Sequence, residues 1–325
     1  MLIPEFWAES RARHRSKNRQ ITVRRFGWSD TSQADAQAMA DRRVQESLQR
    51  LIAGETLTRR EPKVPYGGAD GLPIREEVVR RAGPDVLTRN SYGALCLNSP
   101  DVLFIDIDFP TGPPLKFYAI YLAITLGIPA LFTILVEPKP ALIIAAVAMV
   151  VLGAWICDLI FSAWLKLQGG PERVMQRRIE RFLQNRPDWH FRIYRTPAGI
   201  RAIAMHRTFL ADDPEVAKCF DALGADRQYA RMCRLQKCFR ARVSPKPWRI
   251  GMTRHIRPGR GAWPAPPEVQ PQRQAWIDDY ESRSKAYAAC RFMEAAGSMS
   301  TTTRTNTVCR LHDEFSRAES GLPIA

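Results

Sequence analysis

LKFYAIYLAITLGIPALFTILV (residues 115–136) and ALIIAAVAMVVLGAWICDLIFSAWL (residues 141–165) are the two long apolar stretches of this chain, and they dominate its predicted fold. The first carries no charged side chain after Lys116, and the second carries one, Asp158. As a helix of about 1.5 Å per residue, either stretch would cross a hydrocarbon layer of about 30 Å. The sequence therefore predicts a transmembrane helical hairpin over residues 115–167. The alternative is a buried helical hairpin of a soluble protein.

The basic residues near the hairpin predict its orientation. The connection between the two stretches contains only Lys139, whereas five basic residues follow the second stretch: Lys166, Arg173, Arg177, Arg178 and Arg181. The positive-inside rule then places both long flanks in the cytoplasm, as in a two-pass protein of a bacterial inner membrane. Asp158 is expected near the cytoplasmic interface, and its role stays open. The first residues show no signal-peptide pattern.

Charge and cysteine content indicate where the basic residues gather and which state the thiols have in the two flanks. The formal net charge is +15, and residues 168–325 contribute most of it, with 28 Lys/Arg against 16 Asp/Glu. The seven cysteines are scattered and odd in number, which favours reduced thiols over a disulfide framework. Their spacing matches no structural zinc motif.

Hydrophobic periodicity predicts an α+β fold assembled from both flanks, with residues 1–110 and 171–260 forming one discontinuous domain and residues 272–325 adding C-terminal helices. Residues 6–20 are interpreted as a solvated basic arm, and residues 75–81 as a short helix. Helices are expected over residues 33–53, 171–184 and 272–296, and near 307–318. Strands are expected over residues 21–28, 86–89, 92–97, 102–109, 189–195 and 200–206.

Two acids lie on one face of the predicted strand over residues 102–109. Asp106 and Asp108 are two residues apart, so their Cα atoms would be about 7 Å apart on the same side. From that spacing two carboxylates can share a divalent cation. A strand end that emerges into solvent explains the pair equally well, so both interpretations stay open.

The strongest polar signal is the segment 227–260, which has 11 Lys/Arg and no acid. Candidate anion-binding residues there are Arg240, Arg242, Lys246 and Arg249, with Trp248 or Tyr229 available to stack on a base. The same charge could face anionic lipid at the inner leaflet. It could instead pair with acids inside the fold, Asp106 and Asp108 among them.

Several stretches resemble an uncharacterised bacterial membrane-protein family: FGWSD (26–30), IREE (74–77), TRNSYG (88–93), LFIDIDFP (103–110), YRT (194–196) and CFRARVSPKPWR (238–249). The acidic strand, followed by a helix and a glycine-turn hairpin, is also similar to the palm of archaeo-eukaryotic-type primases. That resemblance implies Asp106 and Asp108 as ligands of Mg or Mn, and Gly199, Arg201 and His206 at the second motif. His206 lies farther from the turn than the family pattern has it, and a third acidic motif is absent.

Two functions follow. The first is a non-enzymatic, membrane-anchored module whose basic surface meets anionic lipid, nucleic acid or an acidic partner. The second is a divalent-metal-dependent nucleotidyl or phosphoryl transferase, in which Arg201, Arg240 and Arg242 would receive phosphates. No Walker A loop, dinucleotide-binding glycine fingerprint, nucleophile elbow or H-E-x-x-H motif is present. This argues against the common nucleotide-binding, hydrolase and metalloprotease classes, though it does not exclude an enzyme. The sequence leaves the oligomeric state and the ligand open.

Overall fold

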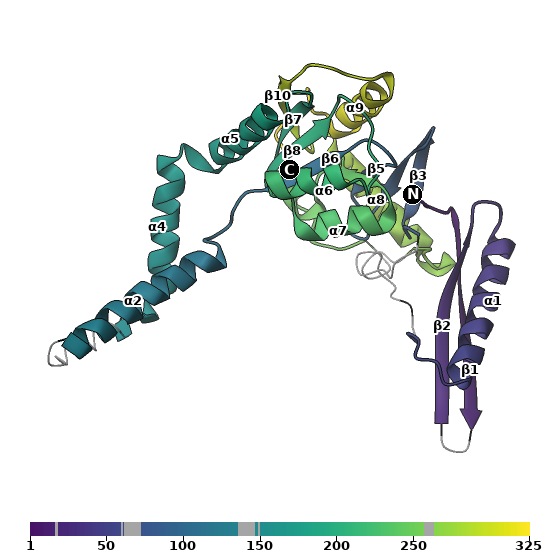
Figure 1. The fold of residues 1–325 in the computed structure, drawn as a ribbon. Helices are drawn as coiled ribbons and strands as arrows, with labels where there is room; N and C mark the ends of the chain where they lie inside the picture. The colour runs from purple at the N-terminus through teal and green to yellow at the C-terminus, as the bar shows by residue number, and fades with distance from the viewer. Residues whose placement is uncertain (17–18, 60, 62–72, 136–146, 149, 257–262) are drawn as a thin grey trace. The chain divides into compact units, whose positions relative to one another are not determined.

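The computed structural model describes residues 1–16, 19–59, 61, 73–135, 147–148, 150–256 and 263–325 (Figure 1). The chain divides into two compact units. The first consists of residues 1–107 and 183–325, and the second of residues 108–182. Both helices and strands are well represented, so the protein is α+β.

The N-terminal part of the first unit is a two-stranded ribbon backed by a helix (Figure 1). Strands β1 (Phe6–Ser16) and β2 (Arg19–Ser29) pair antiparallel without a register shift, from Phe6 opposite Ser29 to Ser16 opposite Arg19. Helix α1 (Gln33–Ile52) begins at Ser32, whose side chain accepts a hydrogen bond from the Asp35 amide. The predicted basic arm of residues 6–20 is therefore mostly an ordered strand.

The first unit contains two further sheets of four strands. One has the order β3-β4-β5-β9 and the other β10-β7-β8-β6. The strands of the first are β3 (Glu77–Ala82), β4 (Asp85–Arg89), β5 (Leu95–Ser99) and β9 (Phe239–Arg242). Those of the second are β6 (Phe104–Asp108), β7 (His190–Thr196), β8 (Gly199–Ala204) and β10 (Arg291–Gly297). Each sheet joins strands from both sides of the second unit in sequence.

Helices flank these sheets and complete the core of the first unit. They are α6 (Pro214–Leu223), α7 (Arg227–Gln236), α8 (Gln270–Ser284) and α9 (Thr303–Ser316), with short 3-10 helices η2 (Pro247–Ile250) and η4 (Pro267–Val269). Among the largest fully buried side chains are Phe104, Trp189, Phe191, Tyr194 and Phe239. Trp189 directly precedes β7, and the other four lie in strands of the two sheets. Both sheets therefore contribute aromatic side chains to the core of this unit.

The second unit holds the two apolar stretches. Helix α2 (Leu115–Leu135) packs on α4 (Gly153–Leu167), with the Phe117 and Phe161 ring centroids 6.2 Å apart. The Tyr118 hydroxyl donates a hydrogen bond of 3.0 Å to Asp158, so this carboxylate has a partner within the helix pair. Many apolar side chains of both helices are exposed, Leu115 and Trp155 among them. Helix α5 (Gly170–Asn185) begins in this unit.

The prediction of a transmembrane hairpin is wrong. Within the part of the chain that the structure describes, no helix is both long enough and apolar enough to cross a membrane. The described helix of the second stretch, α4, has 15 residues, about 22 Å, against roughly 30 Å of hydrocarbon. The predicted two-pass inner-membrane location, with both termini in the cytoplasm, lacks support for the same reason. Residues 136–146 and 149 of the two predicted spans and their connection lie outside the described residues.

Two local predictions also differ from the structure. Residues 75–81, predicted as a helix, mostly belong to β3. The predicted helix over residues 272–296 ends at Ser284, and β10 follows it, pairing antiparallel with β7. Both segments are edge strands: β3 forms a hairpin with β4, which follows it directly, and β10 gains backbone hydrogen bonds from the distant β7. This pairing outweighs a weak local preference for helix.

Candidate functional site: an aromatic groove with a basic margin

A groove of about 1500 Å³ lies between the β4–β5 turn, residues 251–256 and helix α8. This volume exceeds the 300–1000 Å³ common for small-molecule pockets, so an extended ligand fits it better than a compact one. The lining combines aromatic, cationic and small polar groups, including Tyr92, Thr253, Arg254, His255, Trp276 and Arg283. It also includes an acid, Asp279, which pairs with Arg283 at 2.8 Å.

The β4–β5 turn that forms one wall is shaped by Asn90 and Gly93. The Asn90 side chain accepts hydrogen bonds from the amides of Tyr92 (3.2 Å) and Ala94 (3.1 Å), which closes the turn locally. Gly93 has a φ of +97°, and a Cβ built there would overlap the Trp276 ring. Glycine is therefore required twice, once by the left-handed backbone and once by the close approach of the tryptophan.

Trp276 fixes the opposite wall on α8. Its ring stacks on Tyr280 with centroids 5.3 Å apart and planes 8° apart, and its indole N–H donates to the Arg254 carbonyl at 2.9 Å. The Tyr280 hydroxyl in turn donates to the Pro245 carbonyl at 2.7 Å. The segment that carries Arg254 and His255 is thus held against α8 by hydrogen bonds to buried or half-buried aromatic side chains.

The margin of the groove presents an exposed tryptophan with a cation beside it. Trp248 of η2 is 53% exposed, and its ring lies 5.3 Å from that of Tyr92. The ammonium group of Lys246 lies 5.4 Å from the Trp248 ring centroid, within cation–π range. Prolines 245 and 247 limit the backbone freedom of this segment. The sequence-predicted pair of Lys246 and Trp248 therefore lies next to Tyr92, which the sequence alone did not single out.

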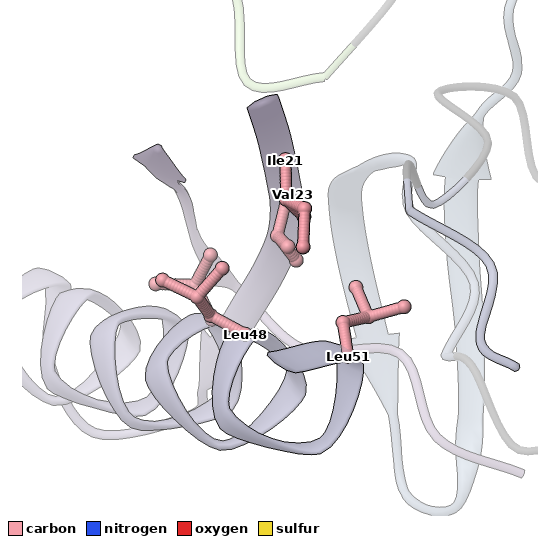
Figure 2. Close-up of a cluster of buried hydrophobic side chains, with 5 residues drawn as sticks. Ile21, Val23, Leu48 and Leu51 are labelled. Atoms are coloured by element: carbon pink, nitrogen blue, oxygen red, sulfur yellow. The ribbon is translucent and has the colours of Figure 1, made fainter. Parts of the chain in front are cut away.

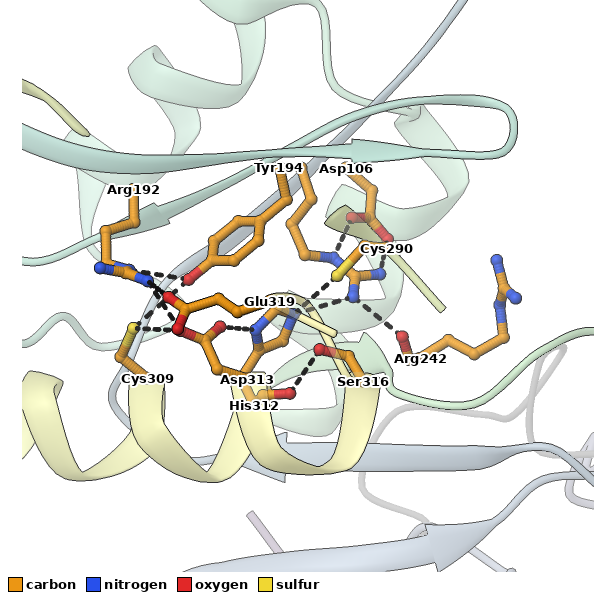
Figure 3. A network of polar contacts seen from close by, with 11 residues as sticks. Asp106, Arg192, Tyr194, Arg242, Cys290, Cys309, His312, Asp313, Ser316 and Glu319 are labelled. Carbon is orange, nitrogen blue, oxygen red and sulfur yellow. Dashed lines mark hydrogen bonds and ion pairs between the residues drawn. The ribbon is translucent and has the colours of Figure 1, made fainter. Parts of the chain in front are cut away.

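Asp106, one of the two predicted metal ligands, forms a two-point ion pair with Arg201 (Figure 3). Arg201 Nε lies 2.6 Å from Asp106 Oδ1, and Nη2 lies 2.9 Å from Oδ2. Arg201 is 2% exposed, and its Nη1 also donates to the Arg242 carbonyl at 2.9 Å. Asp108 is exposed at the end of β6.

These contacts do not fit a metal held by the two acids. Both oxygens of Asp106 accept from one guanidinium, so the Arg201 cation already balances the charge of this carboxylate. Among the described residues, no group of three or more His, Cys, Asp or Glu side chains is arranged to hold a metal ion. We therefore derive no metal-dependent step. Arg201, predicted to bind phosphate, instead neutralises Asp106.

The Asp106–Arg201 pair continues into a buried polar network that the sequence did not reveal (Figure 3). Arg201 Nη1 lies 3.2 Å from Nε2 of His312 on α9, and His312 Nδ1 lies 2.9 Å from Asp313 Oδ1. Because a guanidinium only donates, Nε2 accepts and Nδ1–H donates to Asp313. Asp313 also accepts from Arg192 at 2.8 Å. Burial alone would raise the pKa of Asp313, but His312 and Arg192 hold it below its usual range.

Cys290 lies beside this network, with Sγ 3.8 Å from His312 Nε2. A thiol, an imidazole and a carboxylate in sequence form the usual activating set of a cysteine nucleophile. Here Cys290 and His312 are both 0% exposed, so no substrate atom can reach the sulfur. The arrangement is best understood as a packed, hydrogen-bonded interior that holds α9 against β7 and β8.

Comparison with known proteins gives no match. No family model fits the sequence, and neither curated proteins nor solved structures show a significant relative. The resemblances to an uncharacterised bacterial family and to the primase palm therefore stay predictions. The case for function rests on the residues and their geometry.

The remaining predicted residues divide between interior and surface. Arg240 is 4% exposed and pairs with Glu76, itself 3% exposed, at 2.6 Å. Arg242 is half-buried and donates to the Ser244 carbonyl at 3.3 Å. Lys246 and Arg249 are partly exposed in or beside η2. The basic segment thus serves two roles: Arg240 pairs inside the fold, while Lys246, Arg249 and Arg254 lie at or near the surface beside the groove.

Two further aromatic candidates belong to the interior. The Tyr229 hydroxyl donates to the Phe104 carbonyl at 2.9 Å, so this ring is held against β6. The His206 ring packs on Trp189, with centroids 4.7 Å apart, and burial lowers its pKa. Both side chains are explained by packing.

Proposed function

We propose that this protein binds single-stranded nucleic acid, with bases stacking in the aromatic groove and phosphates meeting its basic margin. The observation that carries the proposal is the exposed Trp248, flanked by Tyr92 and Lys246 at the entrance to a groove that also contains Arg254 and His255. Every base has a π face, and base–aromatic stacking tolerates any sequence. Cations spaced along the same groove neutralise the backbone.

The combination of groups favours nucleic acid over the other anionic partners that the basic segment suits. An acidic protein surface offers carboxylates but few planar faces for Trp248 and Tyr92. An anionic lipid surface is flat, whereas the groove is concave and about 1500 Å³ in volume. Unpaired bases with their phosphates satisfy both the aromatic and the cationic groups.

The test is binding of a labelled 12-nucleotide single strand, measured by fluorescence anisotropy. Trp248→Ala is expected to weaken binding about tenfold, because a stacked base contributes about 1–3 kcal/mol. Lys246→Gln is expected to reduce the slope of log K against log salt concentration by about 0.7. Trp155→Ala is the matched control, since it removes another exposed tryptophan, from the second unit.

Three outcomes would overturn the proposal. The wild-type protein could show no salt-dependent binding of the strand. Trp248→Ala and Trp155→Ala could behave alike, which would remove the role of the groove. Anionic vesicles or an acidic peptide could bind with the same dependence on Trp248, which would assign the groove to another partner.

A further inference from the structure

The β1–β2 ribbon has two different faces, as its register shows. Residues directly opposite each other in an antiparallel pair share a face. Ala12 is opposite Val23, and both belong to the cluster that packs on α1. The alternate pairs, Arg11 with Arg24, Arg13 with Thr22 and Arg15 with Gln20, therefore point away from the helix.

Helix α1 packs against one face of the β1–β2 ribbon. Ile21 and Val23 of β2 pack against Val44, Leu48 and Leu51 of α1, as Figure 2 shows for this cluster. Gly27 lets the backbones come close, because a Cβ there would overlap Ala36 and Ala40. A two-stranded ribbon alone is only marginally stable, and this packing supplies the hydrophobic face that it needs.

The outer face of the ribbon is divided along its length. Its aromatic half is covered, since the Arg75 guanidinium lies 4.0 Å from the Phe26 ring centroid and 5.8 Å from that of Trp7. Its other half carries Arg11, Arg13 and Arg15, all exposed. Arg11 pairs with Glu9 at 2.6 Å, and Glu9 is the one acidic residue of either strand. Helix α1, in contrast, mixes acidic and basic residues.

The spacing of these arginines matches a duplex. Residues two apart on a strand are separated by about 6.8 Å, and each strand of B-DNA rises about 3.4 Å per nucleotide, so consecutive arginines advance by about two base pairs. The major groove of B-DNA, about 12 Å wide, admits a two-stranded ribbon. The open half carries the three arginines together with Gln20 and Thr22. Its described residues include no aromatic ring on which an unpaired base could stack.

We infer that the open half of the ribbon's outer face, centred on Arg11, Arg13 and Arg15, inserts into the major groove of double-stranded B-form DNA. Its guanidinium groups contact phosphates and guanine edges, and Gln20 can reach adenine, since these pairings suit the donors available in that groove. The inference does not depend on the aromatic groove, because it uses a separate surface and a different form of nucleic acid.

The test compares two matched double variants of the full chain on a 20-base-pair DNA duplex, by fluorescence anisotropy over a range of salt concentrations. Arg13→Gln/Arg15→Gln removes two charges from the outer face. Arg42→Gln/Arg50→Gln removes two exposed charges from α1.

The ribbon variant should bind the duplex at least tenfold more weakly, and its slope of log K against log salt should fall by about 2, since each phosphate contact contributes about 0.9. The helix variant should stay within about twofold of wild type. Circular dichroism checks that both variants are folded.

The design separates this inference from the proposed function. Trp248→Ala should leave duplex binding unchanged, and the ribbon variant should leave single-strand binding unchanged. Three results would overturn the inference: no duplex binding by the wild type, equal losses in the two double variants, or equal affinity for a duplex of RNA. The last result would exclude insertion, because the major groove of A-form RNA is too narrow and deep for side chains to read.

Discussion

Asp106 and Arg201 form a two-point ion pair between neighbouring strands β6 and β8, although 95 residues separate them in the chain. The guanidinium is almost fully buried, whereas the carboxylate is about one-third exposed. This asymmetry means that the arginine depends on the acid for its charge balance, and that loss of the acid leaves an unpaired buried cation.

Asp106→Asn should therefore destabilise the protein by about 3 kcal/mol, the low end of the range for breaking a buried pair, since Asp106 keeps some solvent contact. Urea denaturation measures the change. Asp108→Asn, two residues along the same strand and exposed, should change the free energy of unfolding by less than about 0.5 kcal/mol. Equal, small effects accompanied by loss of Mn²⁺ binding in both variants would instead support the metal hypothesis.

Gly93→Ala should lower the stability of the protein and displace the Trp276 ring in the wall of the groove. The left-handed backbone at Gly93 and its contact with Trp276 both disfavour a side chain there. Gly83 provides the control: its φ is +61°, but nothing lies within 4 Å of the position of a Cβ. Gly83→Ala should cost only about 1–2 kcal/mol, the price of the backbone conformation alone. Thermal unfolding compares the two variants. If Gly93→Ala were no worse than Gly83→Ala, the packing of Trp276 on the turn would be refuted.

Glu215 at the start of α6 should contribute to acid sensitivity. Hydrogen bonds from Arg186 and Lys218 lower the pKa of Glu215 to about 2, against an ordinary value near 4.5. A depressed pKa stabilises the folded state above the ordinary value, and this contribution disappears as the pH falls from about 4.5 towards 2. Unfolding free energies of wild type and Glu215→Gln should differ most at neutral pH and converge in that window. A difference that stays constant with pH would contradict the assignment.

The cysteines offer a test of the packed interior. All seven are free and buried, and burial raises the pKa of Cys238 and of Cys309 to about 11. We expect no rapid reaction with a thiol reagent in the native protein and seven modified sites in denaturant. A fast native thiol would show that the interior opens.

Local sequence signals predicted the elements that depend on near neighbours. The helical spacing of Val44, Leu48 and Leu51 identified α1, and these residues do form its buried face. The tight turn at residues 196–199 identified the β7–β8 hairpin. The alternation around Asp106 correctly predicted a strand there, but its partner Arg201 is too distant in sequence for any pattern to indicate.

Other elements were missed. β1 has small residues, Ala8 and Ala12, where a strand usually shows large apolar ones, because α1 packs closely against them. The spacing of Tyr287 and Cys290 fits a helix, yet the chain there leads into β10, whose pairing with β7 decides its conformation. In the basic segment, charge alone could not distinguish Arg240, which pairs with buried Glu76, from the surface around Trp248.

Arg304 of α9 binds both Asp85 and Asp101, which lie more than 200 residues earlier, with the shortest N–O distance to each being 2.6 Å. Strand pairing between β5 and β9 and between β6 and β8 likewise joins the two ends of the chain. On the ribosome, one edge each of β5 and β6 stays unpaired until their partners β9 (Phe239–Arg242) and β8 (Gly199–Ala204) have emerged. Long-range closure of this kind makes folding slow and leaves unpaired strand edges open to aggregation in the meantime. A nascent chain of this protein is therefore a natural client for chaperones that shield such edges.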